Sequence, residues 1–318
     1  MLYLLLLITG FLPLIYGANL LVDSASSLAK KFNIPNIVIG LTIVAFGTSA
    51  PELIVNLFSA ISGNTSLALG NVIGSNIFNI AGILGISAMI FPLTVKSSTT
   101  WIEIPLALLS ALLVFIVAND VLIDGSASSV ISRIDGIVLL LFFVIFLVYT
   151  YQMIRSGDFS DEIPVKDIAP GKAVLLIIAG LALLVAGGRM IVYGAVELAT
   201  SWGMSERLIG LTIVSIGTSL PELATSVVAA RKKNTDIAVG NIVGSNIFNV
   251  FLILGATAVI NPVPFQEGAM TDILVNILVS LMLFMFIFTG KGRRLERWEG
   301  VIFIGLYLGY IGYLVSQI

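Results

Sequence analysis

The 318-residue chain contains no cysteine and no histidine. Without cysteine it forms no disulfides and no thiolate metal sites, and without histidine it has no imidazole-bound zinc and no histidine acid–base chemistry. Only 11% of its residues are charged and 58% are hydrophobic. In a soluble domain about 25% of the residues are charged and about 45–50% are apolar. It also lacks a phosphate-binding glycine loop with its lysine, so ATP-driven pumping by this chain is not expected. The composition predicts an integral membrane protein with no nucleic-acid partner.

Ten apolar runs are long enough to span a lipid bilayer. They fall at roughly 2–22, 36–61, 67–92, 101–118, 135–154, 172–192, 207–230, 236–261, 270–289 and 299–316. We therefore predict an all-α membrane fold of ten transmembrane helices. The second, third, seventh and eighth contain glycine, proline and polar residues and are expected to be broken, whereas the fourth, fifth, ninth and tenth look like plain lipid-facing or packing helices.

The chain contains an internal repeat. A shift of 170 residues lays 36–85 onto 206–255 without a gap, with about half of the positions identical. A polar linker from Arg155 to Pro170 divides the helices five and five, which predicts repeats 1–160 and 161–318 within one transmembrane domain. Because five crossings is an odd number, the second repeat must enter the membrane from the opposite side. Such inverted repeats are typical of secondary transporters with a binding site near the bilayer midplane.

Lysine and arginine are distributed unequally over the predicted loops. One side holds Lys30, Lys31, Lys96, Arg155, Lys166, Lys172, Arg231, Lys232, Lys233, Lys291, Arg293, Arg294 and Arg297, and the other holds Arg133, Arg189 and Arg207. The positive-inside rule places the first side in the cytoplasm. We therefore predict a multi-pass protein of the cell membrane with both termini outside.

A polar motif interrupts the second apolar run, Gly47-Thr48-Ser49-Ala50-Pro51-Glu52, and recurs in the seventh as Gly217-Thr218-Ser219-Leu220-Pro221-Glu222. Proline has no N–H and clashes with the carbonyl four residues earlier, so each helix should break and leave the carbonyls of Gly47 and Gly217 unpaired. Unpaired backbone at membrane depth is tolerated where it is buried in protein or lines a cavity. The motif therefore predicts a polar cavity at each break.

Glu52 and Glu222 are the only charged residues in their apolar runs. Intramembrane carboxylates usually mark ion paths. The alternative is a structural ion pair, for which Arg189, toward a helix end, is the nearest candidate. A buried carboxyl group can also stay protonated when no ion is bound, which a proton-coupled carrier would use.

The second motif runs from Gly70 to Asn79 and recurs from Gly240 to Asn249. Its serine and second asparagine are four residues apart and share a helix face, so the oxygens of Ser75, Asn79, Ser245 and Asn249 could complete a ring begun by the glutamates. The glycines Gly70, Gly74, Gly240 and Gly244 would allow close helix approach, and simple packing explains them equally well.

Together the motifs form an all-oxygen site with a formal charge of −2. Calcium takes about 6–8 oxygen ligands in flexible geometry, so the site suits one Ca²⁺ or a set of Na⁺ ions competing for the same carboxylates. Mutually exclusive occupation of this kind is the physical basis of exchange.

The paired motifs resemble the α-repeats of the cation/Ca²⁺ antiporter superfamily, in particular its Na⁺/Ca²⁺ exchanger branch. The resemblance implies a Ca²⁺ site made by Glu52, Glu222 and the carbonyls of Thr48 and Thr218. It implies Na⁺ sites made by the same glutamates with Ser49, Ser75, Ser219, Ser245 and the carbonyls of Ala45 and Ser215, with Asn79 and Asn249 bordering the central site.

The chain departs from some branches of this superfamily. Potassium-dependent exchangers and some prokaryotic members carry aspartate where this chain has Asn249, so K⁺ co-transport is not expected. Proton/Ca²⁺ exchangers typically carry a Gly-Asn-x-x-Glu pattern, and the cytoplasmic Ca²⁺-sensing loop of animal exchangers is absent.

We therefore predict a secondary antiporter, not an enzyme, that exchanges Na⁺ for Ca²⁺ by alternating access, without a cofactor and as a monomer. The first and sixth helices, with Gly10, Gly17, Gly187 and Gly188, could slide or rock to expose the site to either side. The main alternative is an H⁺/Ca²⁺ antiporter on the same fold. Inverted repeats argue against a cation channel, and no further catalytic group supports an intramembrane enzyme.

Overall fold

The computed structural model describes residues 2–63, 65, 68–125, 128–156, 166–203, 215–265, 268–289 and 292–317. Eight helices in this part of the chain are long and apolar enough to cross a membrane, and a bent pair of helices is a ninth candidate. These nine correspond to nine of the predicted apolar runs. The remaining run, 207–230, is described from residue 215 onward, and 207–214 lies outside the described residues.

The described elements are almost all helical, with π-helical segments labelled η. In chain order they are α1 (Leu2–Lys31), α2 (Asn36–Ile39), η1 (Gly40–Val44), α3 (Ala45–Thr48), α4 (Ala50–Ile61), α5 (Ala68–Ile77), η2 (Phe78–Leu84), α6 (Gly85–Ile90), β1 (Leu93–Thr94), η3 (Thr99–Glu103), α7 (Ile104–Val117), α8 (Asp120–Asp124), β2 (Val130–Ile131), α9 (Arg133–Ser156), α10 (Pro170–Ser201), α12 (Ser215–Thr218), α13 (Leu220–Arg231), α14 (Thr235–Ile247), η5 (Phe248–Leu254), α15 (Gly255–Ile260), β3 (Val263–Pro264), α16 (Ala269–Phe286), β4 (Arg294–Leu295) and α17 (Arg297–Ser316).

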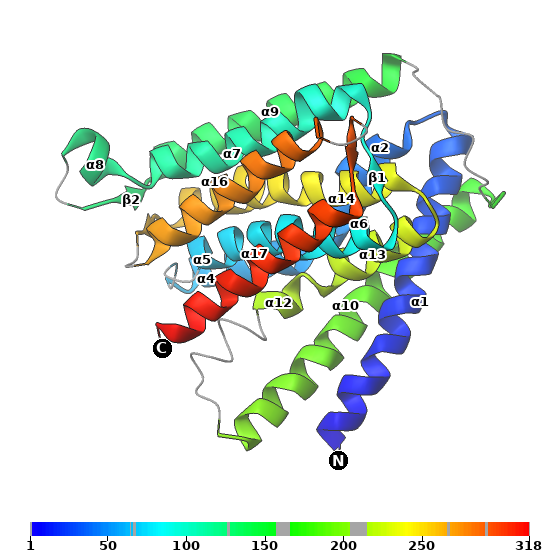
Figure 1. The fold of residues 1–318 in the computed structure, drawn as a ribbon, viewed down its shortest axis with the longest axis horizontal. Helices are drawn as coiled ribbons and strands as arrows, with labels where there is room; N and C mark the ends of the chain where they lie inside the picture. Colours follow the sequence, from blue (N-terminus) through cyan, green and yellow to red (C-terminus); the bar gives the residue numbers. More distant parts are fainter. Residues whose placement is uncertain are drawn as a thin grey trace.

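Helices α1 and α10 lie side by side and antiparallel (Figure 1). Their glycines bring the two backbones into contact: a Cβ added at Gly17 would lie 2.7 Å from the Gly180 carbonyl oxygen, and one at Gly187 would lie 2.6 Å from the Leu14 nitrogen. Side chains larger than hydrogen therefore do not fit at these positions. Close contact of this kind is the usual way that membrane helices associate through small residues, and it joins α1 and α10 into one rigid pair.

The two halves of the chain are packed crosswise. Gly300 of α17 lies against Gly85 of α6, and Gly136 of α9 lies against Gly255 of α15, with an added Cβ at Gly300 or Gly136 meeting the opposite carbonyl at 2.6 Å. The short strands also join the two halves: β1 pairs with β4 and β2 pairs with β3, both antiparallel. The last helix of each half therefore packs on the third helix of the other half, and the halves interlock.

The expected helix breaks occur in only some of the predicted places. The second predicted helix bends by 48° between Asn36–Thr48 and Ala50–Ile61, and α12 and α13 are separated at Ser219. The third and eighth helices are continuous, so the prediction that they are broken was wrong. They contain no proline and keep their hydrogen bonds by accommodating an extra residue as a π-helix, in η2 and η5.

The fourth and ninth helices are less plain than predicted. Each carries a carboxyl group that accepts a hydrogen bond from a tyrosine of a neighbouring helix. The Tyr149 hydroxyl of α9 donates to Glu103 of η3 at 2.5 Å, and the Tyr310 hydroxyl of α17 donates to Asp272 of α16 at 2.7 Å. These tyrosines allow an acidic side chain to lie inside an otherwise apolar helix pair.

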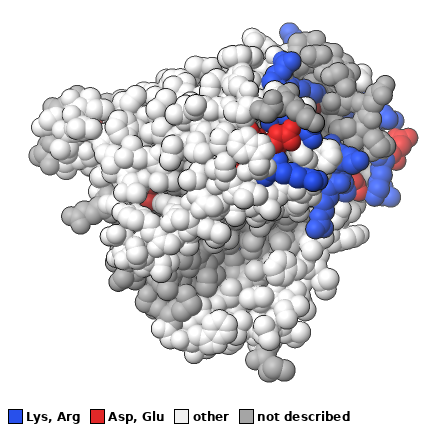
Figure 2. Space-filling view, viewed as in Figure 1, with Lys and Arg blue, Asp and Glu red and all other residues white. Residues whose placement is uncertain are grey.

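The lysines and arginines in view in Figure 2 gather at one end of the molecule, and both ends of the chain, marked in Figure 1, lie away from that cluster. This grouping agrees with the unequal loop charges of the sequence. Two of the counted residues, Arg207 and Lys291, lie outside the described residues.

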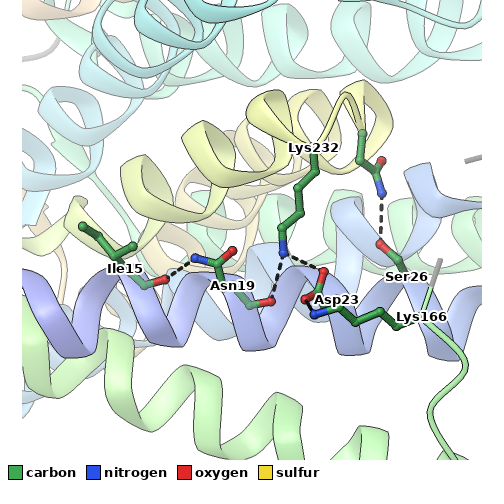
Figure 3. A network of polar contacts seen from close by, with 7 residues as sticks. Ile15, Asn19, Asp23, Ser26, Lys166 and Lys232 are labelled. Carbon is green, nitrogen blue, oxygen red and sulfur yellow. Dashed lines mark hydrogen bonds and ion pairs between the residues drawn. The ribbon is translucent and has the colours of Figure 1, made fainter. Parts of the chain in front are cut away.

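At this basic end, α1 extends past its predicted end at residue 22 and is tied to two other segments (Figure 3). Asp23 accepts hydrogen bonds from Lys232 at 2.6 Å and from Lys166 at 2.8 Å, and the Asn234 side chain donates to Ser26 at 3.0 Å. The bond to Asp23 raises the pKa of Lys166. The polar residues that suggested an early helix end therefore bind the turn after α13 and the segment that leads into α10.

This network predicts unequal effects of its two lysines on stability. The Lys232 side chain is 31% exposed and the Lys166 side chain is 72% exposed. Replacing Lys232 with Met should reduce the free energy of unfolding by about 1 kcal/mol, and replacing Lys166 with Met should have little effect because water screens exposed pairs. Thermal unfolding in detergent micelles measures both. Equal losses in the two variants would contradict this ranking.

Candidate cation site

Both motif glutamates lie in the first turn of a helix that begins at the break. Glu52 follows Pro51 at the start of α4, and Glu222 follows Pro221 at the start of α13. Proline is well tolerated in the first turn because the N–H that it lacks has no partner there. The motif therefore starts a new helix, and it places a carboxylate that is only 1% exposed next to the break in each half.

Few backbone bonds cross each break. In the first half the Ser49 N–H donates to the Ala45 carbonyl and the Leu53 N–H donates to the Ser49 carbonyl. In the second half the Ser219 N–H donates to Ile216 and the Leu223 N–H donates to Ser219. The acceptors of these bonds are the carbonyls of Ala45, Ile216 and the two serines, and the prediction that the Gly47 and Gly217 carbonyls are unpaired stays a prediction.

The two carboxylates meet through crossed hydrogen bonds between the halves. The Ser49 hydroxyl donates to Glu222 at 2.9 Å, and the Ser219 hydroxyl donates to Glu52 at 3.2 Å. The threonines make the same crossed contacts between the halves: Thr48 lies beside Glu222, and Thr218 lies beside Glu52. The two motif copies, which lie 170 positions apart in the sequence, thus contact each other in one site.

Six of the buried side-chain oxygens without a hydrogen-bond partner belong to residues that the sequence singled out. They form three pairs related by the 170-residue shift: Oε2 of Glu52 and Glu222, Oγ of Ser75 and Ser245, and Oδ1 of Asn79 and Asn249. Buried polar atoms are rarely left unpaired in proteins. The set contains two carboxylate oxygens and no nitrogen, so its chemistry fits a hard cation.

Four further residues that the sequence singled out lie in α3 and α12, next to the breaks. The Ala45 carbonyl accepts the Ser49 N–H at 2.9 Å. The Ser215 carbonyl is not the acceptor for Ser219, and the Ser215 side chain lies outside the described residues. Thr48 is fully buried and its hydroxyl lies 3.0 Å from Asn241 Oδ1, whereas Thr218 is partly exposed.

Three asparagines in the site were missed from the sequence. Asn76 and Asn246 accept hydrogen bonds from the side-chain nitrogens of Asn249 and Asn79, each at 2.9 Å. Asn241 Nδ2 donates to Ser226 at 3.0 Å. The signal was present, because Asn76 and Asn246 recur at the same 170-residue shift inside the second motif.

The motif glycines differ between the halves. An added Cβ at Gly240 would lie 2.9 Å from the Ile37 carbonyl oxygen, and one at Gly244 would lie 2.7 Å from that of Leu41. Close packing is confirmed for these two, which face the segment α2–η1. Gly70 has open space around its Cβ position, so the packing prediction was wrong there.

A structural ion pair does not explain the glutamates in the described part of the chain. The ion pairs found there join Lys96, Lys166, Lys232 and Arg294 to carboxylates other than Glu52 and Glu222. Arg189 is exposed and lines a groove of about 750 Å³ between α10 and the segment η1–α4. Among the same residues no cluster of three or more acidic side chains forms, so the site has two carboxylates.

Comparison with known proteins gives one matching family. Its profile, described as "Sodium/calcium exchanger protein", matches residues 2–152 and 172–316. The match therefore includes both copies of each motif.

Individual relatives match over nearly the whole chain. The chain is 38% identical to the "Putative antiporter CaxA" of Alkalimonas amylolytica, covering 98% of each chain. It is 32% identical to the "Sodium/calcium exchanger MaX1" of Methanosarcina acetivorans, covering 96% of this chain and 97% of that one. Among solved structures it resembles the sodium-calcium exchanger NCX_Mj soaked with 10 mM Na⁺ and zero Ca²⁺, with a TM-score of 0.82, 30% identity and 98% coverage of each chain.

The unpaired oxygens predict that a cation stabilises the folded protein. Calcium at about one hundred times its dissociation constant should raise the free energy of unfolding by about 2.7 kcal/mol, measured as a higher melting temperature in detergent. The double variant Glu52→Gln/Glu222→Gln should lose this shift because it has no carboxylate to bind the ion. Glu103→Gln, which changes a buried carboxyl group outside the site, should keep it. A shift that persists in the double variant would rule out this site.

Proposed function

Because the chain belongs to the sodium/calcium exchanger family, whose members are membrane transporters and not enzymes, we propose that it exchanges Na⁺ for Ca²⁺ across the cell membrane. The observation that carries this proposal is the set of six unpaired oxygens around two crossed carboxylates. Inward flow of Na⁺ would drive Ca²⁺ out of the cell.

We assign the ligands as the resemblance implies. Calcium would be held by Glu52, Glu222 and the carbonyls of Thr48 and Thr218. Sodium would use the same glutamates with Ser49, Ser75, Ser219, Ser245 and the carbonyls of Ala45 and Ser215, and Asn79 and Asn249 would border the site. Since both ions need the two carboxylates, binding of one set excludes the other.

The proposed membrane arrangement has ten helices in two inverted repeats, 1–160 and 161–318. Three features support it: the 170-residue shift that relates the motifs, the crosswise packing of α9 and α17, and the collection of lysine and arginine at one end. The basic end would be cytoplasmic and both termini outside. Because one chain supplies both carboxylates, we propose that a monomer is sufficient.

Alternating access would come from motion of the α1–α10 pair against the helices that hold the site. The glycine contacts join these two helices tightly, so they would move together. The groove between α10 and η1–α4 leaves room for such motion. Helix α10 also contacts the break in the second half, because an added Cβ at Gly188 would lie 3.9 Å from the Gly217 carbonyl oxygen.

The proposal predicts sodium-dependent calcium flux. Proteoliposomes loaded with Na⁺ and diluted into Na⁺-free medium should take up ⁴⁵Ca²⁺, and Glu52→Gln or Glu222→Gln should reduce the initial rate at least about a hundredfold because a carboxylate ligand is lost. Glu103→Gln is the matched control and should retain uptake.

The same vesicles test the coupling ion. A K⁺ gradient added to the Na⁺ gradient should leave uptake unchanged, because position 249 is asparagine. Uptake driven by a pH gradient in the absence of Na⁺ would favour the H⁺/Ca²⁺ alternative and overturn sodium coupling. Currents far above carrier turnover would indicate a channel.

A further inference from the structure

Four asparagines form a closed, two-fold arrangement between α5–η2 and α14–η5. Asn79 Nδ2 donates to Asn246 Oδ1, and Asn249 Nδ2 donates to Asn76 Oδ1, each at 2.9 Å. Asn76 Nδ2 donates to the Asn246 backbone carbonyl, and Asn246 Nδ2 donates to that of Asn76, each at 3.3 Å. All four side chains are no more than 2% exposed. We call this group the amide cross.

The amide cross fixes which atom of the Asn79 and Asn249 carboxamides is left without a partner. The nitrogens of Asn76 and Asn246 are held by backbone carbonyls, so their Oδ1 atoms are the ends available to Asn249 and Asn79. Those acceptors bind nitrogen and not oxygen, so the Nδ2 atoms of Asn79 and Asn249 are held within the amide cross. Their Oδ1 atoms are left unpaired.

This orientation matters because the two ends of a carboxamide have nearly the same shape and opposite polarity. If Asn79 flipped, its N–H groups would point at the cation and would replace an attraction with a repulsion. We propose that Asn76 and Asn246 are positioning residues that keep the Asn79 and Asn249 oxygens turned toward the transported ion. This inference rests on the proposed cation site.

The competing explanation is that the amide cross only joins the two helices. Both explanations predict harm from removing Asn246, but they differ when Asn79 is replaced with aspartate. A carboxylate has oxygen at both ends, so its flip state has no effect on the ion. In the Asn79→Asp variant the side chain at position 79 no longer has to be held in one orientation. Any role of Asn246 in packing the two helices remains.

The experiment measures ⁴⁵Ca²⁺ uptake for Asn246→Leu alone, for Asn79→Asp alone and for the double variant. With Asn79 in place, Asn246→Leu should raise KM for Ca²⁺ about tenfold, the effect of about one lost charge-assisted contact, with kcat changed less than about twofold. In the Asn79→Asp background the same change should alter KM less than about twofold. Asn76→Leu with Asn249→Asp repeats the test at the other half.

The outcomes separate the two explanations. An equal loss from Asn246→Leu in both backgrounds, or no loss when Asn79 is unaltered, would overturn the positioning role. Asn276→Leu, at a buried asparagine of α16 outside the amide cross, is the size-matched control and should leave KM unchanged. If a leucine variant does not fold, serine, which is too short to accept these bonds, replaces it. Absence of Ca²⁺ uptake by the unaltered protein would instead defeat the proposed function.

Discussion

The structure depends on two carboxylates held together in a membrane interior without a cationic side chain nearby in the described residues. Burying one such charge costs several kcal/mol, and two like charges increase the cost. The crossed serine hydroxyls satisfy one oxygen of each glutamate, and the second oxygen of each stays unpaired. The site is therefore favourable only when cations or protons neutralise it. A site that must always be neutralised favours exchange of one ion for another over release of an ion alone.

The rest of the fold holds this crossing through close contacts between helices. The last helix of each half is locked onto the third helix of the other by glycine contacts, and the strand pairs β1–β4 and β2–β3 join the same halves again. The α1–α10 pair is equally tight internally, but it borders the site across a groove. Its basic end is anchored through Asp23, Lys166 and Lys232. Under the proposed mechanism, the α1–α10 pair would move against the frame that the other helices form.

Repetition made the central residues predictable. Glu52 and Glu222 were found because a carboxylate in an apolar run is unfavourable and because it occurs twice at one shift. The same logic located the breaks that contain proline, before Glu52 and Glu222, but not the continuous third and eighth helices, which contain no proline. The π-helices in η2 and η5, the extension of α1 to Lys31 and the amide cross were not predicted. Each depends on which partner a polar group finds in three dimensions, and Asp23 or Asn246 alone carries no sign of that partner.

Under the proposed mechanism, the difference between the repeats would explain a glycine that packing leaves unexplained. Gly240 is pressed against Ile37, but its counterpart Gly70 contacts nothing at its Cβ position. If packing in this one state were the only constraint, a larger residue would fit at Gly70. In an inverted-repeat transporter the two halves exchange conformations as the site opens to the opposite side. Under the proposed mechanism Gly70 would then take the crowded environment that Gly240 has here, so a position that is open in one state needs glycine in the other.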